Sequence, residues 1–257
     1  SFSDRRDRAL FPAAYADPDS GVSTSRGGPG MRLPVCRSPL RYTGQDAIRA
    51  DIAHFQAALA DAGVDEGFMT SIAPGSASRI GNEHYRTEEE FIHACAESMR
   101  EEYWKLSMIR VEALNHELRG LPWERIRFHL CWGSWHGPHV TDIPLRDIVD
   151  VMLAVDCQAY SFEAGNVRHE HEWKVWRDVK LPDGKILIPG VVSHATNVVE
   201  HPELVADRIV RFASLVGRER VIAGTDCGLG GRVHPDIAWA KLETLAQGAA
   251  LASRQLY

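Results

Sequence analysis

The chain has 257 residues, of which 44% are hydrophobic and 25% are charged, the composition of a globular protein that can bury a substantial core. Its net charge of −6 excludes the basic surface of a nucleic-acid-binding protein, and no apolar run approaches the roughly 18 residues of a membrane span. Five cysteines without a pairing pattern, and a polar first segment unlike a signal peptide, predict a cytoplasmic protein with free thiols.

The first half of the sequence predicts mainly helices. In chain order it predicts a loop-like segment over 1–31, a short strand near 33–36, a helix over 46–62, a strand over 64–76 and a helical pattern over 88–119. Gly63 follows the first of these helices, in the position where glycine commonly ends a helix. Thr87 is followed by acidic residues, a pattern that is typical of a helix N-terminus.

The second half alternates between strands and helices. Strands are predicted over 125–132, 159–164, 185–192 and 220–228, and helices over 144–155, 201–217 and 235–253. This alternation indicates a parallel sheet covered by helices, and an open doubly wound sheet and a TIM-type barrel both satisfy it. No strand is followed by the glycine-rich fingerprint of a dinucleotide-binding fold, which makes the doubly wound alternative less favourable.

Three of these strands end in residue types that bind metals. His129 and Cys131 lie two residues apart, so the period of a strand places both on the same face. Glu163 closes the next strand, and Cys227 lies at the end of the last one. In a barrel these strand ends meet at one rim, where imidazole, thiolate and carboxylate together favour a tetrahedral Zn²⁺ site. The alternative for any one cysteine is a small buried hydrophobic residue.

A zinc site of this kind has a clear chemical use. Zinc lowers the pKa of a bound thiol and holds it as the thiolate. An exchangeable ligand, most readily a carboxylate, would leave room for the sulfur of a substrate. The predicted centre would therefore activate a thiol nucleophile and not a water molecule.

Several stretches of the sequence resemble a known family. FHLCWGS, SFEAGN, IPGVVSHATN, HPELVADRI and VIAGTDCGL are similar to the catalytic domain of cobalamin-independent methionine synthase, and most similar to its short stand-alone relatives. The resemblance is strong over 121–245 and looser over about 32–120. It implies that residues 1–257 form one catalytic (β/α)8 barrel. It also implies methionine biosynthesis by methyl transfer from 5-methyltetrahydrofolate to homocysteine.

The resemblance further implies roles for individual residues. The implied zinc ligands are His129, Cys131, Glu163 and Cys227, and the zinc would bind the thiol of homocysteine. His194 would act as the general acid, and Ser193 would contact homocysteine. The alternative for His194 is a loop imidazole that bonds to the backbone.

Other residues near these strand ends have competing interpretations. Asp226, beside a ligand, would orient the site. Trp132 would stack on a pterin ring or pack at the rim. His136 and His139 are expected to be bystanders, because four better ligands exist. The stretch 168–173, RHEHEW, is expected to be solvated and not a second metal site, because no cysteine accompanies it.

Two pieces of the family pattern are absent from this sequence. Nothing before residue 32 matches the opening strand with its His-Val-Gly-Ser motif, and no strand with an acidic pair interrupts the helical pattern over 88–119. The resemblance therefore implies a barrel that lacks an N-terminal and a mid-barrel strand. It also leaves no acidic residue to hold the amino group of the thiol substrate.

Three functions remain as hypotheses. The leading one is a zinc-dependent S-methyltransferase whose partners are a small-molecule thiol and a folate-like methyl donor. The second is another zinc-thiolate alkyltransferase, which adds a thiol cofactor to an epoxide, since the missing amine anchor fits a thiol other than homocysteine. The third is a non-catalytic zinc-binding remnant. A homo-oligomer that supplies the missing strands would favour this third hypothesis, because exposed sheet edges need covering.

Overall fold

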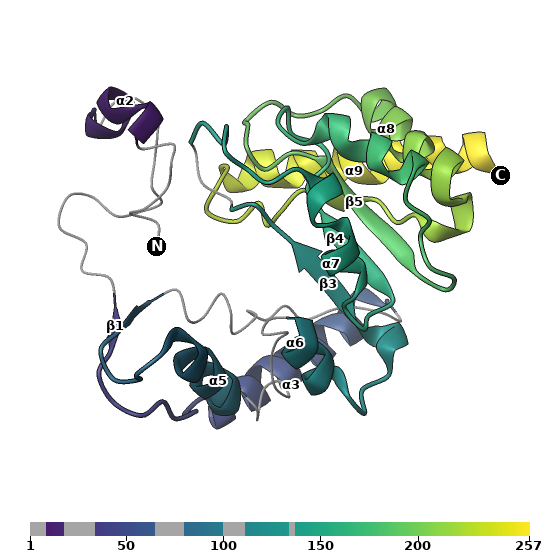
Figure 1. The fold of residues 1–257 in the computed structure, drawn as a ribbon. Coiled ribbons are helices and arrows are strands. Elements are labelled where there is room, and N and C mark those ends of the chain that lie inside the picture. Colours follow the sequence, from purple (N-terminus) through teal and green to yellow (C-terminus); the bar gives the residue numbers. More distant parts are fainter. Residues whose placement is uncertain (1–8, 18–33, 65–79, 100–110, 134–136) are drawn as a thin grey trace. The chain divides into compact units, whose positions relative to one another are not determined.

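The computed structural model describes residues 9–17, 34–64, 80–99, 111–133 and 137–257 (Figure 1). The chain divides into two compact units, one from Ser1–Pro29 and Pro122–Tyr257 and the other from Gly30–Leu121. This division does not test whether residues 1–257 act as one domain, so the single-domain expectation stays a prediction. Within the described ranges, no helix combines the length and the apolar character needed to cross a membrane.

The unit Gly30–Leu121 contains helices and a small parallel sheet. The helices are α3 (Gln45–Ala62), α5 (Glu88–Met99) and α6 (Val111–Leu118), and the strands are β1 (Val35–Cys36) and β2 (Gly81–Asn82). Gly63, at φ +63°, ends α3 as predicted. The hydroxyl of Thr87 accepts the backbone N–H of Glu90 at 3.0 Å, which confirms the predicted helix start. The strand predicted over 64–76 lies almost wholly outside the described residues, as does the middle of the 88–119 pattern.

The other unit is built on a parallel sheet with the strand order β3-β4-β5-β6 (Figure 1). The strands are β3 (Arg127–Leu130), β4 (Ala159–Phe162), β5 (Ile186–Val192) and β6 (Gly224–Thr225). The helices of this unit are α2 (Pro12–Ala16), α7 (Val149–Leu153), α8 (Pro202–Val216) and α9 (Pro235–Leu256). Short 3-10 segments are η2 (Trp123–Arg125), η3 (Leu145–Asp147), η4 (Glu170–Arg177) and η5 (Arg218–Arg220). The predicted α/β class with parallel strands is confirmed.

The observed elements differ from the predicted ones in two respects. Within the described residues the sheet does not close into a barrel, because β3 and β6 are its outer strands. The helix predicted over 144–155 is interrupted: α7 begins only after Ile148, whose φ of −129° is not helical. The side chain of Glu172 accepts the N–H of Leu145 at 2.6 Å, so a residue distant in the sequence satisfies this backbone group at the start of η3.

Helices α8 and α9 pack against each other beside β5 (Figure 1). Their shared core consists of the buried residues Val191, Val192, Val205, Ala206, Ile209 and Ala252. Gly248 of α9 permits this close approach, because a Cβ at that position would collide with Val205 of α8. The core holds β5 in place, and β5 lies between β4 and β6, two of the strands whose ends carry predicted ligands.

The pairing register brings the ends of the strands to one edge of the sheet. Leu130 of β3 pairs with Phe162 of β4, which in turn pairs with Pro189 of β5. Further along β5, Val192 pairs with Thr225 of β6. Because the strands are parallel, the residues that follow β3, β4 and β6 all leave the sheet at this edge. The predicted ligands Cys131, Glu163 and Cys227 are among those residues, and His129 lies within β3, next to its last residue.

Asp226 lies against Gly190 in a space that only glycine leaves free. A Cβ at Gly190 would come closer than 3.0 Å to the backbone and the carboxylate of Asp226, an approach that real Cβ atoms essentially never show. We predict that Gly190→Ala lowers the free energy of unfolding by at least about 2 kcal/mol, because backbone atoms cannot move aside easily. Gly230→Ala is the control, since a Cβ there meets nothing within 4 Å. Equal denaturant midpoints for the two variants would contradict this packing.

Candidate metal centre

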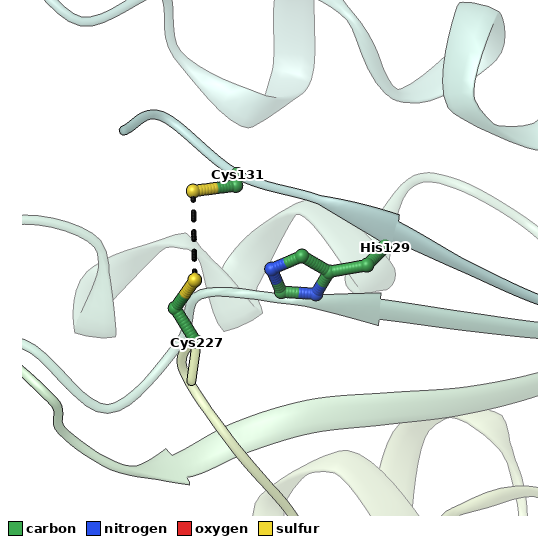
Figure 2. Close-up of side chains that lie close together, drawn as sticks. All are labelled: His129, Cys131 and Cys227. Atoms are coloured by element: carbon green, nitrogen blue, oxygen red, sulfur yellow. Dashed lines mark hydrogen bonds between the residues drawn. The ribbon is translucent and has the colours of Figure 1, made fainter. Parts of the chain in front are cut away.

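The imidazole of His129 and the thiols of Cys131 and Cys227 come together at the edge of the sheet (Figure 2). Each offers one donor atom, and these atoms all lie within 4.8 Å of one another. The two sulfur atoms are 3.8 Å apart. Three of the four residues predicted to bind zinc therefore lie together. Zinc binding by these residues stays a prediction.

Neighbouring groups orient these donor atoms. Nδ1 of His129 lies 3.0 Å from the hydroxyl of Ser161, its partner on β4, which leaves Nε2 available for a metal. The backbone N–H of Gly133 donates to the sulfur of Cys131 over 3.2 Å, a contact that favours the thiolate. Gly133 has φ +108°, which residues with a side chain rarely adopt, so this turn requires glycine.

The surroundings of the Cys131 thiol oppose its ionisation unless a cation is bound. The hydrogen bond with Cys227, burial, and the charges of Cys227 and Glu163 raise the pKa of the Cys131 thiol far above its usual value. A divalent cation would reverse this balance, because the thiolates and the carboxylate could then share one positive centre. Two thiolates and an imidazole suit Zn²⁺ better than Mg²⁺ or Ca²⁺. The residues present therefore fit a zinc ion.

Glu163, the predicted fourth ligand, is buried directly after β4, with 4% of its surface exposed. It is not part of the group of three, and both of its oxygens have partners. Oε1 accepts the backbone N–H of Trp132, and Oε2 accepts the side-chain amide of Asn166, each at 2.9 Å. Its charge nevertheless contributes to the raised pKa of Cys131, so the carboxylate acts on the thiols. Its role as a ligand stays a prediction.

Asp226, next to Cys227 in the sequence, is fully buried and holds the chain that follows β4. Oδ1 accepts the N–H groups of Ala164 at 2.8 Å and Gly165 at 2.7 Å, and Oδ2 accepts the amide of Asn166 at 3.1 Å. Burial raises the pKa of Asp226 to about 7, although the two backbone hydrogen bonds lower it in part. Sequence reasoning missed Asn166, which joins Asp226 to Glu163 and lies within the quoted stretch SFEAGN.

Ser193 and His194, the predicted substrate contact and general acid, are buried directly after β5. An ion pair fixes this segment: Nζ of Lys241 in α9 lies 2.8 Å from Glu200, whose other oxygen accepts the N–H of Ser193 at 2.8 Å. Lys241 also donates to the carbonyl of Val198. Sequence reasoning missed this pair, although the spacing of Lys241 along α9 matches the buried face of that helix. The roles of Ser193 and His194 stay predictions.

Trp132, the predicted stacking residue, lies on the buried imidazole of His169, with the ring centroids 4.1 Å apart. The nitrogens of that imidazole lie 2.7 Å from Glu172 and 3.2 Å from Asp142. Although burial alone would lower it, the hydrogen bonds to Asp142 and Glu172 raise the pKa of His169 to about 9. The expectation that 168–173 is solvated is wrong for His169 and Glu172, because both are buried in this network.

His139 belongs to the same network and not to the group of metal donors found among the described residues. Its Nδ1 lies 2.7 Å from Asp142, and its φ is +52°. Although burial alone would raise it, the hydrogen bonds with His139 and His169 lower the pKa of Asp142 to about 2. Asp142 is therefore an ionised carboxylate shared by two imidazoles. His136 lies outside the described residues.

A groove of about 730 Å³ lies between the end of β6 and α9. One wall is Thr225 of β6, two residues before Cys227, and the loop 229–233 forms part of the rim. Trp239 and Leu242 of α9 line the groove as well, and both are exposed. The groove therefore combines an apolar wall with a residue that lies two positions before one of the two thiols in the sequence.

These features define an α/β protein with a His/Cys/Cys candidate metal centre. No protein-family model matches the chain. The curated 2-hydroxypropyl-CoM lyase of Xanthobacter autotrophicus is 24% identical over an alignment of 177 residues, and the match covers 57% of this chain and 45% of that protein. The solved B12-independent methionine synthase of Shewanella sp. W3-18-1, in complex with selenomethionine, matches with a TM-score of 0.56 and 18% identity, over 68% of this chain and 58% of that one.

The chain thus spans about half the length of these two proteins. The likeness to the methionine synthase concerns the fold, an α/β arrangement with parallel strands. Both proteins carry the names of enzymes, a lyase and a synthase. The substrates that these two names indicate are considered for this chain only as a proposal.

We predict that Cys131→Ser and Cys227→Ser each abolish stoichiometric zinc binding, because each removes one of two thiolates from the candidate centre. Cys157→Ser is the control, since that thiol is buried in the same unit and donates to the carbonyl of Ala159. Zinc per chain is measured after dialysis of the purified proteins. A Cys131 or Cys227 variant that keeps a full equivalent of zinc would remove that residue from the site.

Lys241→Met should lower the free energy of unfolding by about 3–5 kcal/mol, because it leaves the carboxylate of Glu200 buried without its cation. Adding Glu200→Gln should restore much of this loss, since the amide oxygen can still accept the N–H of Ser193. The free energies of unfolding of the single and double variants are measured by chemical denaturation. A double variant no more stable than Lys241→Met would speak against the pair as the cause.

Proposed function

We propose that this chain is part of an enzyme that binds zinc and activates a thiol for alkylation at sulfur. The observation that carries the proposal is the meeting of His129, Cys131 and Cys227 within 4.8 Å. When bound, zinc supplies a positive centre that keeps a substrate thiol ionised at neutral pH. Because sulfur is intrinsically nucleophilic, a thiolate held at this edge of the sheet is ready to attack an electrophilic carbon.

Glu163 is the group best suited to give way to the sulfur of a substrate. Its oxygens have N–H partners of their own, from Trp132 and Asn166. A carboxylate that leaves the metal would therefore stay hydrogen-bonded, which reduces the penalty of keeping its charge buried. His129, Cys131 and Cys227 are then the permanent ligands, and Glu163 is the exchangeable one.

Methyl transfer from 5-methyltetrahydrofolate to homocysteine is the reaction that we favour. The thiol of homocysteine loses its proton, its sulfur forms a bond to the methyl carbon, and the bond from that carbon to N5 breaks. The electron pair stays on N5, which takes up a proton. His194 is the proposed donor of that proton and Ser193 a proposed contact to homocysteine, because both follow β5 at the edge where the ligands lie.

A second reaction would use the same thiolate, and the name of the curated relative, 2-hydroxypropyl-CoM lyase, favours it. In this reaction the sulfur of a thiol cofactor attacks a carbon of an epoxide, the bond from that carbon to oxygen breaks, and the oxygen takes up a proton. Both reactions need a thiolate, an electrophilic carbon and a proton donor. The same residues could therefore serve either one.

The electrophile needs an apolar surface close to the thiols, and two features provide one. The groove that begins at Thr225 is lined by Trp239 and Leu242. The ring of Trp132 is only partly buried and follows Cys131 directly. We propose that the alkyl donor binds between these features and the metal centre, with an aromatic ring of the donor stacked on Trp132.

The test supplies zinc-loaded protein with two substrate pairs, homocysteine with 5-methyltetrahydrofolate and CoM with epoxypropane. We expect a new thioether from one pair, detected by mass spectrometry, and at least about a hundredfold less of it from Cys131→Ser, because removal of a central catalytic group commonly costs that much. Cys157→Ser should keep the parent activity. Absence of a thioether from both pairs would favour a non-catalytic zinc-binding remnant.

A further inference from the structure

His169 is a buried histidine held between two carboxylates. Its Nδ1 lies 2.7 Å from Glu172, and its Nε2 lies 3.2 Å from Asp142. An ionised carboxylate accepts hydrogen bonds and cannot donate them, so both ring nitrogens carry a proton. The two carboxylates are themselves fixed, because Asp142 also contacts His139 and Glu172 also accepts the N–H of Leu145. The imidazole therefore has one orientation.

Two paths lead from His169 to the two oxygens of Glu163. In the first, the imidazole stacks on Trp132, and the backbone N–H of Trp132 donates to Oε1 of Glu163 at 2.9 Å. In the second, the backbone N–H of His169 donates to Oδ1 of Asn166 at 3.0 Å. The amide of Asn166 then donates to Oε2 of Glu163 at 2.9 Å. Each oxygen of Glu163 is thus held by a direct neighbour of His169.

We propose that His169 is a positioning residue for the candidate metal centre, which fixes the carboxylate of Glu163 through Trp132 and Asn166. The inference rests on the proposed function, because it takes Glu163 as the exchangeable metal ligand. The indole of Trp132 has two anchors, the stack on His169 and a hydrogen bond from Nε1 to the carbonyl of Ile143 at 2.7 Å. Loss of the imidazole removes the first of them and so loosens the residue whose backbone N–H holds Oε1. Removal of the groups that orient metal ligands commonly weakens metal binding by about 10–100-fold.

Zinc dissociation constants, measured by competition with a chelating indicator, test this role in a double-mutant cycle. We expect His169→Gln to weaken zinc binding about tenfold when Glu163 is present. In the Glu163→Gln background the same change should have less than about a twofold effect, because no carboxylate is left to position. His171→Gln is the matched control, since His171 is exposed in the same segment, and it should leave zinc binding unchanged.

Equal losses from His169→Gln in both backgrounds would overturn the proposal, because they would show that His169 supports the fold and not Glu163. A Glu163→Gln variant that binds zinc as tightly as the parent protein would instead remove Glu163 from the ligand set. That result would overturn the exchange step of the proposed function together with the positioning role.

If circular dichroism shows that His169→Gln is unfolded, Trp132→Leu replaces it, because this change removes the ring stack and leaves the ion pairs. It should show the same dependence on Glu163.

Discussion

The buried carboxylate of Asp226 is the interaction on which the candidate site depends. It accepts two backbone N–H groups from the chain after β4 and lies against Gly190 of β5, where no side chain would fit. It therefore ties the ends of three neighbouring strands together at the point where Glu163 and Cys227 leave the sheet. Because a buried carboxylate without partners is costly, these strand ends keep one arrangement relative to one another.

That arrangement brings acidic groups close together. The charges of Cys227 and Glu163 raise the pKa of Cys131. The N–H group of Gly133 donates to Cys131, and those of Trp132 and Asn166 donate to Glu163. The protonated imidazole of His169 lies behind the ring of Trp132. A divalent cation removes this conflict, and the donor types select zinc. A thiol that reaches the metal would ionise readily because the cation stabilises the thiolate.

Local patterns predicted those features that neighbouring residues determine. The helix over 46–62 and the shared face of His129 and Cys131 follow from the periods of helix and strand. Features that depend on distant residues were missed. The helix over 144–155 is interrupted at Ile148, whose φ of −129° is not helical, and its first turn is bonded to Glu172, far along the chain. The alternating charges of 168–173 resemble a solvated segment until their buried partner, Asp142, is known.

Zinc-edge X-ray absorption of the zinc-loaded protein, recorded with and without homocysteine or CoM, tests thiol activation most directly. We predict two sulfur neighbours, Cys131 and Cys227, in the protein alone. On addition of the substrate thiol the number of sulfur neighbours should rise to three, with the loss of an oxygen neighbour as Glu163 leaves. A coordination that ignores both thiols, or a purified chain that binds no zinc, would contradict the proposed role of this site.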